Sequence, residues 1–232
     1  MNHIHQNIVQ MSNVTKVFGS DGQLTAVVRN VNLQARCGEL LVLMGPSGSG
    51  KTTLLTLMAG LISPSEGSVV LFGKDTKEYA LENLQRLRAK NIGFIFQVFH
   101  LLDPLTVLEN VSLVLRFAGH RKRVAQCLAD ELLKQFHIEH VASKFPPQLS
   151  QGEKQRVAIA RAIANDANLI LADEPTASLE TTQGFEVIRI LHEYAKSRAK
   201  CVVIATHDMR LLDFADRVIR LEDGCIIERT AE

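Results

Sequence analysis

The feature that most constrains the fold is a glycine-rich turn between a strand and a helix. Residues 40–44 (LLVLM) form a continuous apolar run, which is typical of a strand buried on both faces. The turn follows directly, with the pattern Gly45-x4-Gly50-Lys51-Thr52, and a helix with Leu54, Met58 and Leu61 on one face should come next. This order predicts a phosphate-binding loop at the end of a buried strand.

The chemistry of this loop suits a nucleotide phosphate. Glycines let backbone N–H groups turn toward the β-phosphate, and the helix N-terminus adds a partial positive charge. Lys51 would pair with the β- and γ-phosphate oxygens, and the Thr52 hydroxyl would ligate Mg²⁺. The alternative is a flexible glycine turn, and a phosphate loop alone indicates only a nucleotide-binding protein. The expected nucleotide contacts in the loop are Gly45, Pro46, Ser47, Gly48, Ser49, Gly50, Lys51, Thr52 and Thr53.

A second motif lies in residues 149–156 (LSQGEKQR). Ser150 and Glu153 form a capping-box pattern at the start of a helix, so a purely structural interpretation explains both. It does not explain Gly152, because glycine in the first turn lowers helix propensity by about 1 kcal/mol relative to alanine. A helix N-terminus with close backbone access suits an anion. The motif therefore indicates a second anion-binding element.

Polar side chains follow three further apolar runs: Asp173 and Glu174 after one, Gln97 after another and His207 after the third. Because ligands of α/β sheets bind at the carboxyl ends of the strands, these four residues should converge on one site. Asp173 should hold Mg²⁺ through water, Glu174 can polarise the attacking water, and Gln97 offers a neutral oxygen to either. Taken singly, adjacent carboxylates are usually solvated, and a strand-end histidine usually has a structural role.

Strand and helix patterns alternate along the chain. Two short β-prone runs, 8–11 and 24–28, open it, and residues 97–165 are mostly helical. Alternation returns after residue 166 and ends in a hairpin around residues 222–224. The order predicts an α/β fold with a mainly parallel sheet and a helical insertion. Helices are expected at 107–117, at 124–136 with Val124, Leu128 and Leu132 on its apolar face, and between strands at 169–172 and 202–205 with Val187, Leu191 and Tyr194 on one side.

Composition limits the class of protein. The 232 residues suit one α/β domain, and a hydrophobic share of 46% is enough for a sizeable core. Twenty-six basic and 25 acidic residues give a net charge of +1, which argues against nucleic-acid binding. No apolar run approaches the ~18 residues of a membrane span, and the first residues lack a signal-peptide pattern. A cytosolic protein is expected, with Cys37, Cys127, Cys201 and Cys225 as buried, reduced thiols.

The glycine-rich loop at residues 45–52, the motif at residues 149–156 and the carboxylate pair Asp173 and Glu174 resemble the Walker A, signature and Walker B motifs of an ATP-binding cassette (ABC) ATPase. The resemblance covers nearly the whole chain. It implies a P-loop NTPase fold: a RecA-like core with a mainly parallel sheet, an N-terminal antiparallel β part and a helical subdomain. One ABC domain would span residues 7–232, with 7–96 and 166–232 as the nucleotide-binding core and 97–165 as the helical subdomain with the signature motif. The implied activity is hydrolysis of ATP with Mg²⁺.

The resemblance also implies residue roles. Lys51, Gln97, Glu174 and His207 would be catalytic, His207 as the switch histidine that contacts the γ-phosphate. Phe18 stands where the family places an aromatic ring against the adenine, although a lone aromatic residue more often belongs to the core. The implied Mg²⁺ ligands are Thr52, Gln97 and Asp173.

The signature residues Ser150, Gly152 and Glu153 would bind the γ-phosphate of ATP held by a second copy of the chain. ATP would then lie between two copies arranged head to tail, and a twofold dimer would give two equivalent sites from one interface. The sequence departs from the family in two places. Gln151 replaces the first signature glycine, and Glu180 replaces an aspartate in a loop that contacts the partner copy.

An unusually apolar loop, residues 98–105, follows Gln97. Packing in the core is the default interpretation of such a run. In the family, this region forms a groove that receives a short helix of a membrane permease. The implied partners are a permease that docks near Gln97 to Leu105, a second copy of the chain and, indirectly, a periplasmic adaptor, with no nucleic acid. The implied location is the cytoplasmic face of the inner membrane.

Residues around 94–102 and 206–217 look like one exporter branch of the family. That branch includes the macrolide, lipoprotein-releasing and heterocyst-glycolipid exporters, the last being the most similar, and implies lipid, lipoprotein or drug-like cargo. A soluble ABC ATPase of translation or DNA repair is the alternative, but it would normally carry two cassettes or a coiled-coil insertion. A P-loop kinase or GTPase would share Lys51-Thr52 and has no use for residues 149–153.

Overall fold

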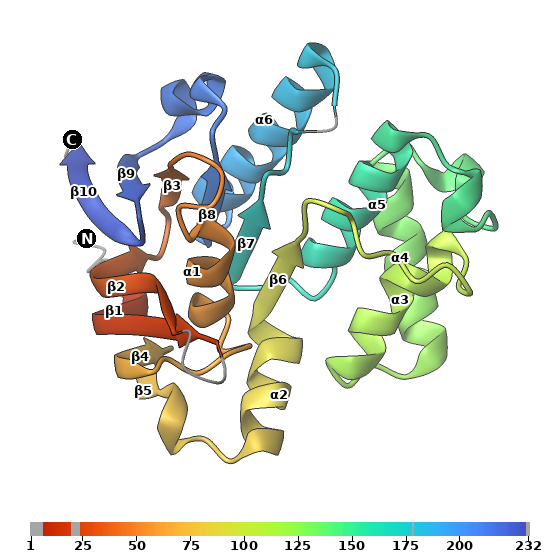
Figure 1. Ribbon diagram of the computed structural model, residues 1–232. Helices are drawn as coiled ribbons and strands as arrows, with labels where there is room; N and C mark the ends of the chain where they lie inside the picture. The colour runs from red at the N-terminus through yellow and green to blue at the C-terminus, as the bar shows by residue number, and fades with distance from the viewer. Residues whose placement is uncertain (1–6, 20–23, 178, 231–232) are drawn as a thin grey trace.

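The computed structural model describes residues 7–19, 24–177 and 179–230, and it contains two sheets (Figure 1). The 4-stranded sheet has the order β2-β1-β4-β5 and is antiparallel. The 6-stranded sheet has the order β10-β9-β3-β8-β7-β6 and is parallel except for the pair β9 and β10. The predicted fold class is therefore confirmed. The strands are β1 Asn7–Phe18, β2 Thr25–Arg36, β3 Leu40–Met44, β4 Glu66–Leu71, β5 Lys74–Asp75, β6 Ile92–Ile95, β7 Leu169–Asp173, β8 Cys201–Thr206, β9 Arg217–Glu222 and β10 Cys225–Thr230.

Strand β3 lies between two hydrophobic cores, because successive residues of a strand face opposite sides of the sheet. Leu41 and Leu43 pack in a core shared with helix α1 (Lys51–Met58) and the antiparallel sheet. Leu40 and Val42 pack on the opposite side with helix α6 (Thr181–Ser197). The continuous apolar run is thus explained, since both faces of this strand are buried.

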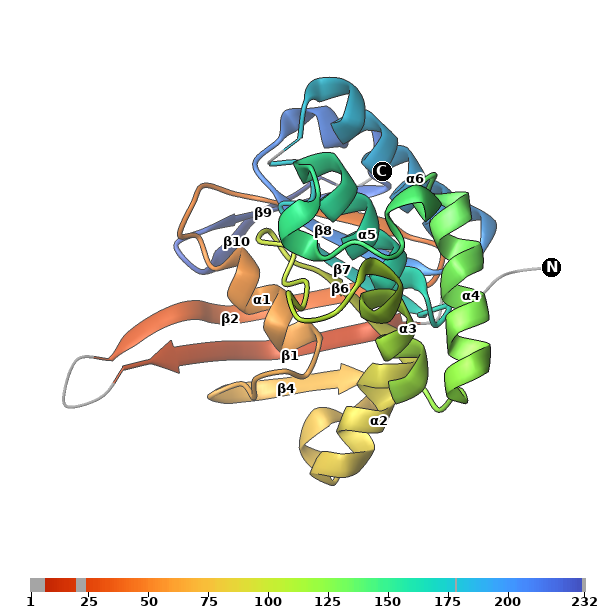
Figure 2. The same cartoon turned by 90° about the vertical axis from the view of Figure 1, so that its right-hand side faces the viewer.

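Residues 97–165 form a mostly helical layer. Its main helices are α3 Val107–Phe117, α4 Lys122–Gln135 and α5 Gln151–Ile163, with the short 3-10 helices η2 Glu139–Val141 and η3 Pro146–Gln148 between α4 and α5. In Figure 2 these helices lie in front of the parallel sheet, and in Figure 1 they stand on the side away from β9 and β10. Helix α5 returns the chain to the sheet, where it packs against β6. The signature motif is therefore carried by the last helix of this layer.

The buried face of α4 differs from the predicted one. Val124 is 47% exposed, whereas Ala125, Ala129 and Leu133 are fully buried. Leu128 and Leu132 of the predicted face still pack against the core but are only partly buried, so the most buried face is shifted by one residue to the stripe with smaller side chains. The alanines allow α4 to approach α3 closely, because they add little side-chain bulk at the contact.

The sequence-based prediction missed several elements and misplaced others. Strands β4 and β5, the 3-10 helix η1 (Thr76–Glu78) and helix α2 (Leu81–Asn91) were not predicted. Helix α2 has no fully buried residue, so its apolar pattern is weak. Leu61 lies beyond the end of α1 and is 47% exposed, so it does not belong to the predicted helix face. Of the four cysteines, only Cys201 is buried; Cys37 and Cys225 are partly buried, and Cys127 is exposed.

Candidate active site

The glycine-rich loop connects β3 to α1 in a conformation that requires glycine. Gly50 has a φ of 98° and caps the N-terminus of α1. A Cβ atom on Gly50 would lie 2.6 Å from the carbonyl oxygen of Val27, and one on Gly45 would lie 2.2 Å from that of Leu221. Backbone atoms cannot easily yield at such distances. The loop is thus pressed between β2 and β9, with the first turn of α1 open to the outside for a ligand.

Lys51 is held inside its own loop. Its Nζ donates hydrogen bonds to the carbonyl oxygens of Gly45 and Pro46 at 2.8 and 3.0 Å and lies 3.7 Å from the Glu174 Oε1. The side chain is only 7% exposed. Ser49 Oγ, in the same loop, is buried and has no hydrogen-bond partner among the described residues. A fixed cation beside an unpaired hydroxyl fits a phosphate group as ligand.

Thr52 and Asp173 meet at the base of this site. Thr52 Oγ1 donates a hydrogen bond to Asp173 Oδ2 at 2.7 Å. Burial raises the pKa of Asp173 above its ordinary value, and neighbouring Glu174 adds to the rise, whereas Thr52 and Lys51 oppose it. A bound cation would offset this destabilisation of the carboxylate. The described residues contain no cluster of three or more His, Cys, Asp or Glu that could hold a metal alone. This donor set suits Mg²⁺, which commonly binds one or two carboxylates together with substrate phosphates and water.

Glu174 adopts a strained backbone conformation that directs its carboxylate. Its φ is 47°, in the left-handed region, where a non-glycine residue costs about 1–3 kcal/mol. Its N–H donates to the carbonyl oxygen of Ala205 at 2.8 Å. Thr206 Oγ1 donates to its Oε2 at 3.0 Å, and His207 Nδ1 lies 3.0 Å from its Oε1. Both carboxylate oxygens are therefore held by residues at the end of β8.

The predicted convergence of strand-end residues is confirmed. Gln97, Asp173, Glu174 and His207 line one cavity of about 270 Å³, which we call the phosphate cavity. Its remaining lining residues are Val27, Ser47, Gly48, Gly50, Lys51, Thr52 and Thr53. Phe18 is not among them: it lies at the end of β1, 44% exposed, with Lys16 Nζ 5.1 Å from the centre of its ring. An exposed Phe18 contradicts the alternative that this aromatic belongs to the core.

The signature residues lie elsewhere. Ser150 and Glu153 form the predicted capping box at the start of α5, and the hydrogen bonds from Ser150 hold the pKa of Glu153 below its ordinary value. Gly152 lines a separate cavity of about 310 Å³ between α4, α5 and α6. Neither Ser150 nor Glu153 is among the described residues that line the phosphate cavity. One chain therefore carries both anion-binding elements but does not bring them together.

Thr206 is a site residue that sequence reasoning missed. It is fully buried, it donates to Glu174, and its Oγ1 accepts a hydrogen bond from the N–H of Asp208 at 3.0 Å. Its position directly before His207 was the available signal. A threonine that ends an apolar strand is commonly interpreted as a β-former, so the pattern gave no reason to single it out.

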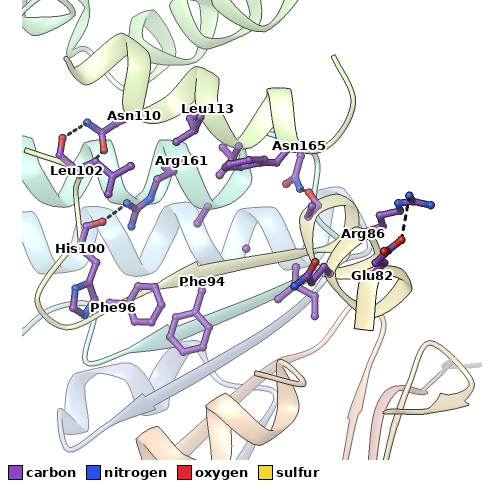
Figure 3. Close-up of a pocket in the computed structure, with 17 residues that line it drawn as sticks. Glu82, Arg86, Phe94, Phe96, His100, Leu102, Asn110, Leu113, Arg161 and Asn165 are labelled. Atoms are coloured by element: carbon purple, nitrogen blue, oxygen red, sulfur yellow. Dashed lines mark hydrogen bonds and ion pairs between the residues drawn. The ribbon is translucent and has the colours of Figure 1, made fainter. Parts of the chain in front are cut away.

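The apolar loop after Gln97 lies mostly outside the core. Val98 is 71% and Leu102 is 47% exposed, whereas Leu101 is partly buried against the core. The default interpretation of this run is therefore wrong for Val98 and Leu102 and holds in part for Leu101. Phe99 and His100 have φ values of 43° and 47°. The loop borders a cavity of about 690 Å³, shown in Figure 3, which we call the docking groove. Its 17 lining residues come from α2, from β6 with Phe96 directly after it, from this loop, from α3, and from α5 with Asn165 just beyond its end.

Comparison with known proteins places this geometry in a family. The model of the ABC transporter family matches residues 28–177. Two similar proteins carry the name putative hemin import ATP-binding protein HrtA. The one from Staphylococcus haemolyticus is 41% identical over 218 residues, covering 94% of this chain and 98% of that protein. The one from Staphylococcus aureus (strain Newman) is 42% identical over 223 residues, with coverage of 94% and 98%.

Solved structures agree with this match. The dimeric ATP-binding cassette MJ0796 in a post-hydrolysis state, bound to ADP and Pi, is 38% identical with a TM-score of 0.91, covering 96% of this chain and 98% of that one. CbiO1 from Clostridium perfringens, part of the ABC transporter complex cbiONQ, is 27% identical with a TM-score of 0.81 and coverage of 96% and 88%. These relatives do not support the alternative of a soluble ABC ATPase outside transport. This chain belongs to the ABC transporter family, as an ATP-binding subunit that binds ATP with Mg²⁺ and hydrolyses it.

Proposed function

We propose that two copies of this chain close head to tail around ATP and thereby power a separate membrane permease. The observation that carries the proposal is the separation of the two anion-binding elements. The phosphate cavity contains Lys51 but no signature residue, and the N-terminus of α5 with Gly152 faces a different cavity. A second copy can supply the missing element, and twofold symmetry then completes both sites at once. The similar ATP-binding cassette MJ0796 has a dimeric structure.

In this proposal the residues of the phosphate cavity divide the work of hydrolysis. Lys51 and the loop N–H groups bind the β- and γ-phosphates, and Thr52, Asp173 and Gln97 hold the Mg²⁺, which neutralises phosphate charge. Glu174 orients the attacking water and takes its proton. His207 holds the Glu174 carboxylate and contacts the γ-phosphate. The support is geometric, because Glu174 Oε1 lies within 3.7 Å of Lys51 Nζ and 3.0 Å of His207 Nδ1.

Two further assignments complete the nucleotide site. Phe18 stacks on the adenine, for which its exposed ring at the end of β1 is available. Ser150, Gly152 and Glu153 of the partner copy contact the γ-phosphate through the N-terminus of α5. Residues 97–165 act as a subdomain that moves these groups relative to the core of 7–96 and 166–232.

The permease would dock in the docking groove and on the loop from Gln97 to Leu105. Exposure of Val98 and Leu102 supports this assignment. The described part of the chain has no helix that is long and apolar enough to cross a membrane. In this proposal the permease supplies the membrane-spanning part of the transporter. The chain would lie at the cytoplasmic face of the inner membrane.

We infer that the cargo is amphipathic. The resemblance to exporters favours lipid, lipoprotein or drug-like substrates, and the relatives are named for import of hemin. These molecules share a large apolar part. Export is our proposal, and transport must be measured in both directions because the relatives' name states the opposite one. A periplasmic adaptor would act through the permease rather than on this chain.

A mixing experiment tests the shared site. Lys51→Ala removes the phosphate-binding cation, and Gly152→Asp places a negative charge at the anion-binding helix end without weakening the helix start. Each variant alone should be inactive. A mixed dimer has one site in which the intact loop of one copy faces the intact signature of the other, so ATPase activity should return on mixing. If the mixture stays as inactive as its components while gel filtration shows dimers, each site lies within one chain and the proposal is wrong.

A further inference from the structure

The docking groove combines an aromatic floor with a helical wall. The rings of Phe94 and Phe96, at and just beyond the end of β6, are stacked with their centres 4.2 Å apart. Leu113 and Phe117 of α3 form part of the opposite wall, and Phe117 is 68% exposed. Figure 3 shows Phe94 and Phe96 on the side of the groove facing Leu113. The groove thus offers apolar side chains to a ligand, which suits a helix that binds through its own apolar side chains.

Three charged side chains line the groove, and two of them neutralise each other. Glu82 and Arg86 lie one turn apart on α2, with Glu82 Oε2 3.8 Å from Arg86 Nη2, and both are largely exposed. They stand together at one end of the groove in Figure 3. The third, Arg161 of α5, has no carboxylate within salt-bridge distance among the described residues. The groove therefore has one uncompensated positive charge.

Arg161 is bound by neutral groups only. Its Nη1 and Nη2 donate to the carbonyl oxygens of His100 and Phe99 at 2.5 and 2.6 Å. Burial lowers the pKa of the guanidinium, and no acidic neighbour opposes this shift. A guanidinium has five N–H donors in a planar fork, so donors remain after these two bonds. A carboxylate is the partner that matches both the remaining donors and the charge.

This inference rests on the proposed docking of a permease. We infer that the segment that binds the docking groove is an amphipathic helix with apolar side chains against Phe94, Phe96 and Leu113 and an aspartate or glutamate paired with Arg161. The pairing has a mechanical consequence. Arg161 stands on the helix that begins with the signature motif, and it also holds the loop that follows Gln97. A carboxylate on Arg161 would thus contact a side chain that joins these two parts of the site.

Synthetic peptides test the inference without knowledge of the permease. The probes are fluorescein-labelled, helix-stabilised peptides of about 14 residues, a length at which an unstabilised helix is marginal in water. They share one apolar face and carry Glu, Gln or Lys at one helix end, with the charged position tested at each end in turn. Fluorescence anisotropy with the full chain should show that the best Glu peptide binds at least about tenfold more tightly than its Gln counterpart, and the Lys peptide least tightly.

Variants of the chain identify the residue responsible. Arg161→Gln should remove the preference for Glu over Gln, and Arg161→Lys should retain part of it because the charge is kept. The matched control is Arg86→Gln, a charge loss of the same size in the same groove, which should leave the preference in place. Circular dichroism and thermal unfolding check that each variant is folded. If Arg161→Gln does not fold, the comparison rests on Arg161→Lys and on the three peptides with the unaltered chain.

The outcomes separate the inference from the docking proposal. Equal binding of the Glu and Gln peptides to the unaltered chain overturns the inference and leaves docking in the groove intact. A preference that persists in folded Arg161→Gln, or is lost equally in Arg86→Gln, also overturns it, because another cation is then responsible. If none of the peptides binds, the groove does not accept a helix, and both the inference and the docking proposal fail.

Discussion

Replacing Thr206 by valine tests how far one buried hydroxyl positions the catalytic carboxylate. Thr206 is fully buried, donates to Glu174 Oε2 at 3.0 Å and accepts from the Asp208 N–H at 3.0 Å. Valine keeps the branched shape and removes both hydrogen bonds. A bond to a charged group contributes about 1.5–3 kcal/mol and a neutral one about 0.5–1.5 kcal/mol. The free energy of unfolding should therefore fall by about 2–4.5 kcal/mol.

Activity should fall for a separate reason. Glu174 sits in a strained conformation and keeps its direction through Thr206 on one oxygen and His207 on the other. With one of these contacts gone, the carboxylate samples more orientations, and misplacement by about 1 Å can cost about a hundredfold in rate. We expect turnover to fall about tenfold to a hundredfold, with ATP affinity little changed because the phosphate loop is untouched.

The measurements are urea unfolding followed by circular dichroism, steady-state ATPase with ATP and Mg²⁺, and titration with a fluorescent nucleotide. Thr206→Ser is the matched control, because it keeps the hydroxyl and removes only a methyl group. It should retain most of the turnover. If the valine and serine variants match each other in turnover and in unfolding free energy, the hydroxyl does not position Glu174 and the reasoning is wrong.

Three further predictions follow from the site. Lys51→Ala should abolish productive ATP binding without unfolding the chain, and a nucleotide titration that gives equal affinities would contradict this. Since the pKa of Asp173 is raised above 3.8, its charged form destabilises the fold, and the contribution of Asp173 to stability should decrease as pH rises from about 3.8 through its raised pKa. Asp173→Asn should therefore be more stable than the unaltered protein at neutral pH without Mg²⁺ and nucleotide, and equal stability there in urea unfolding would refute the assignment. Glu180 is the N-cap of α6 and makes no side-chain capping bond, so Glu180→Asp should add about 0.5–2 kcal/mol of stability at similar turnover. Glu180→Ala should slow turnover through weaker coupling between the two ATP sites. Unchanged turnover and cooperativity in Glu180→Ala would show that Glu180 does not act on the partner copy.

The nucleotide loop and the signature cap were predictable because their causes are local. Gly50 must adopt a positive φ at the start of α1, and the Ser150 and Glu153 pair satisfies backbone N–H groups within a single turn. Both requirements appear as fixed residue types at fixed spacing. Convergence of the strand-end residues was also predictable, since parallel strands place their carboxyl ends at one edge of the sheet.

The missed features depend on contacts between distant parts of the chain. Helix α2 packs through partly buried Leu84 and Leu87 against the core that α1 shares with the antiparallel sheet. The other residues of this helix are mostly polar. The face that α4 buries was decided by how closely it approaches α3, which favoured Ala125 over Val124. Thr206 matters only because Glu174, which directly follows another strand, reaches it. None of these neighbours can be read from one segment alone.

The two-sided burial of β3 has a consequence for dynamics. Its residues pack into both cores, and its backbone is paired with β8 on one side and β9 on the other. Local opening cannot expose its amides without disturbing both cores, so they should exchange with deuterium only through global unfolding. The amides of α2, which has no fully buried residue, should exchange far sooner. The strand that carries the phosphate loop would then be the rigid reference against which the helices of residues 97–165 move in the proposed function.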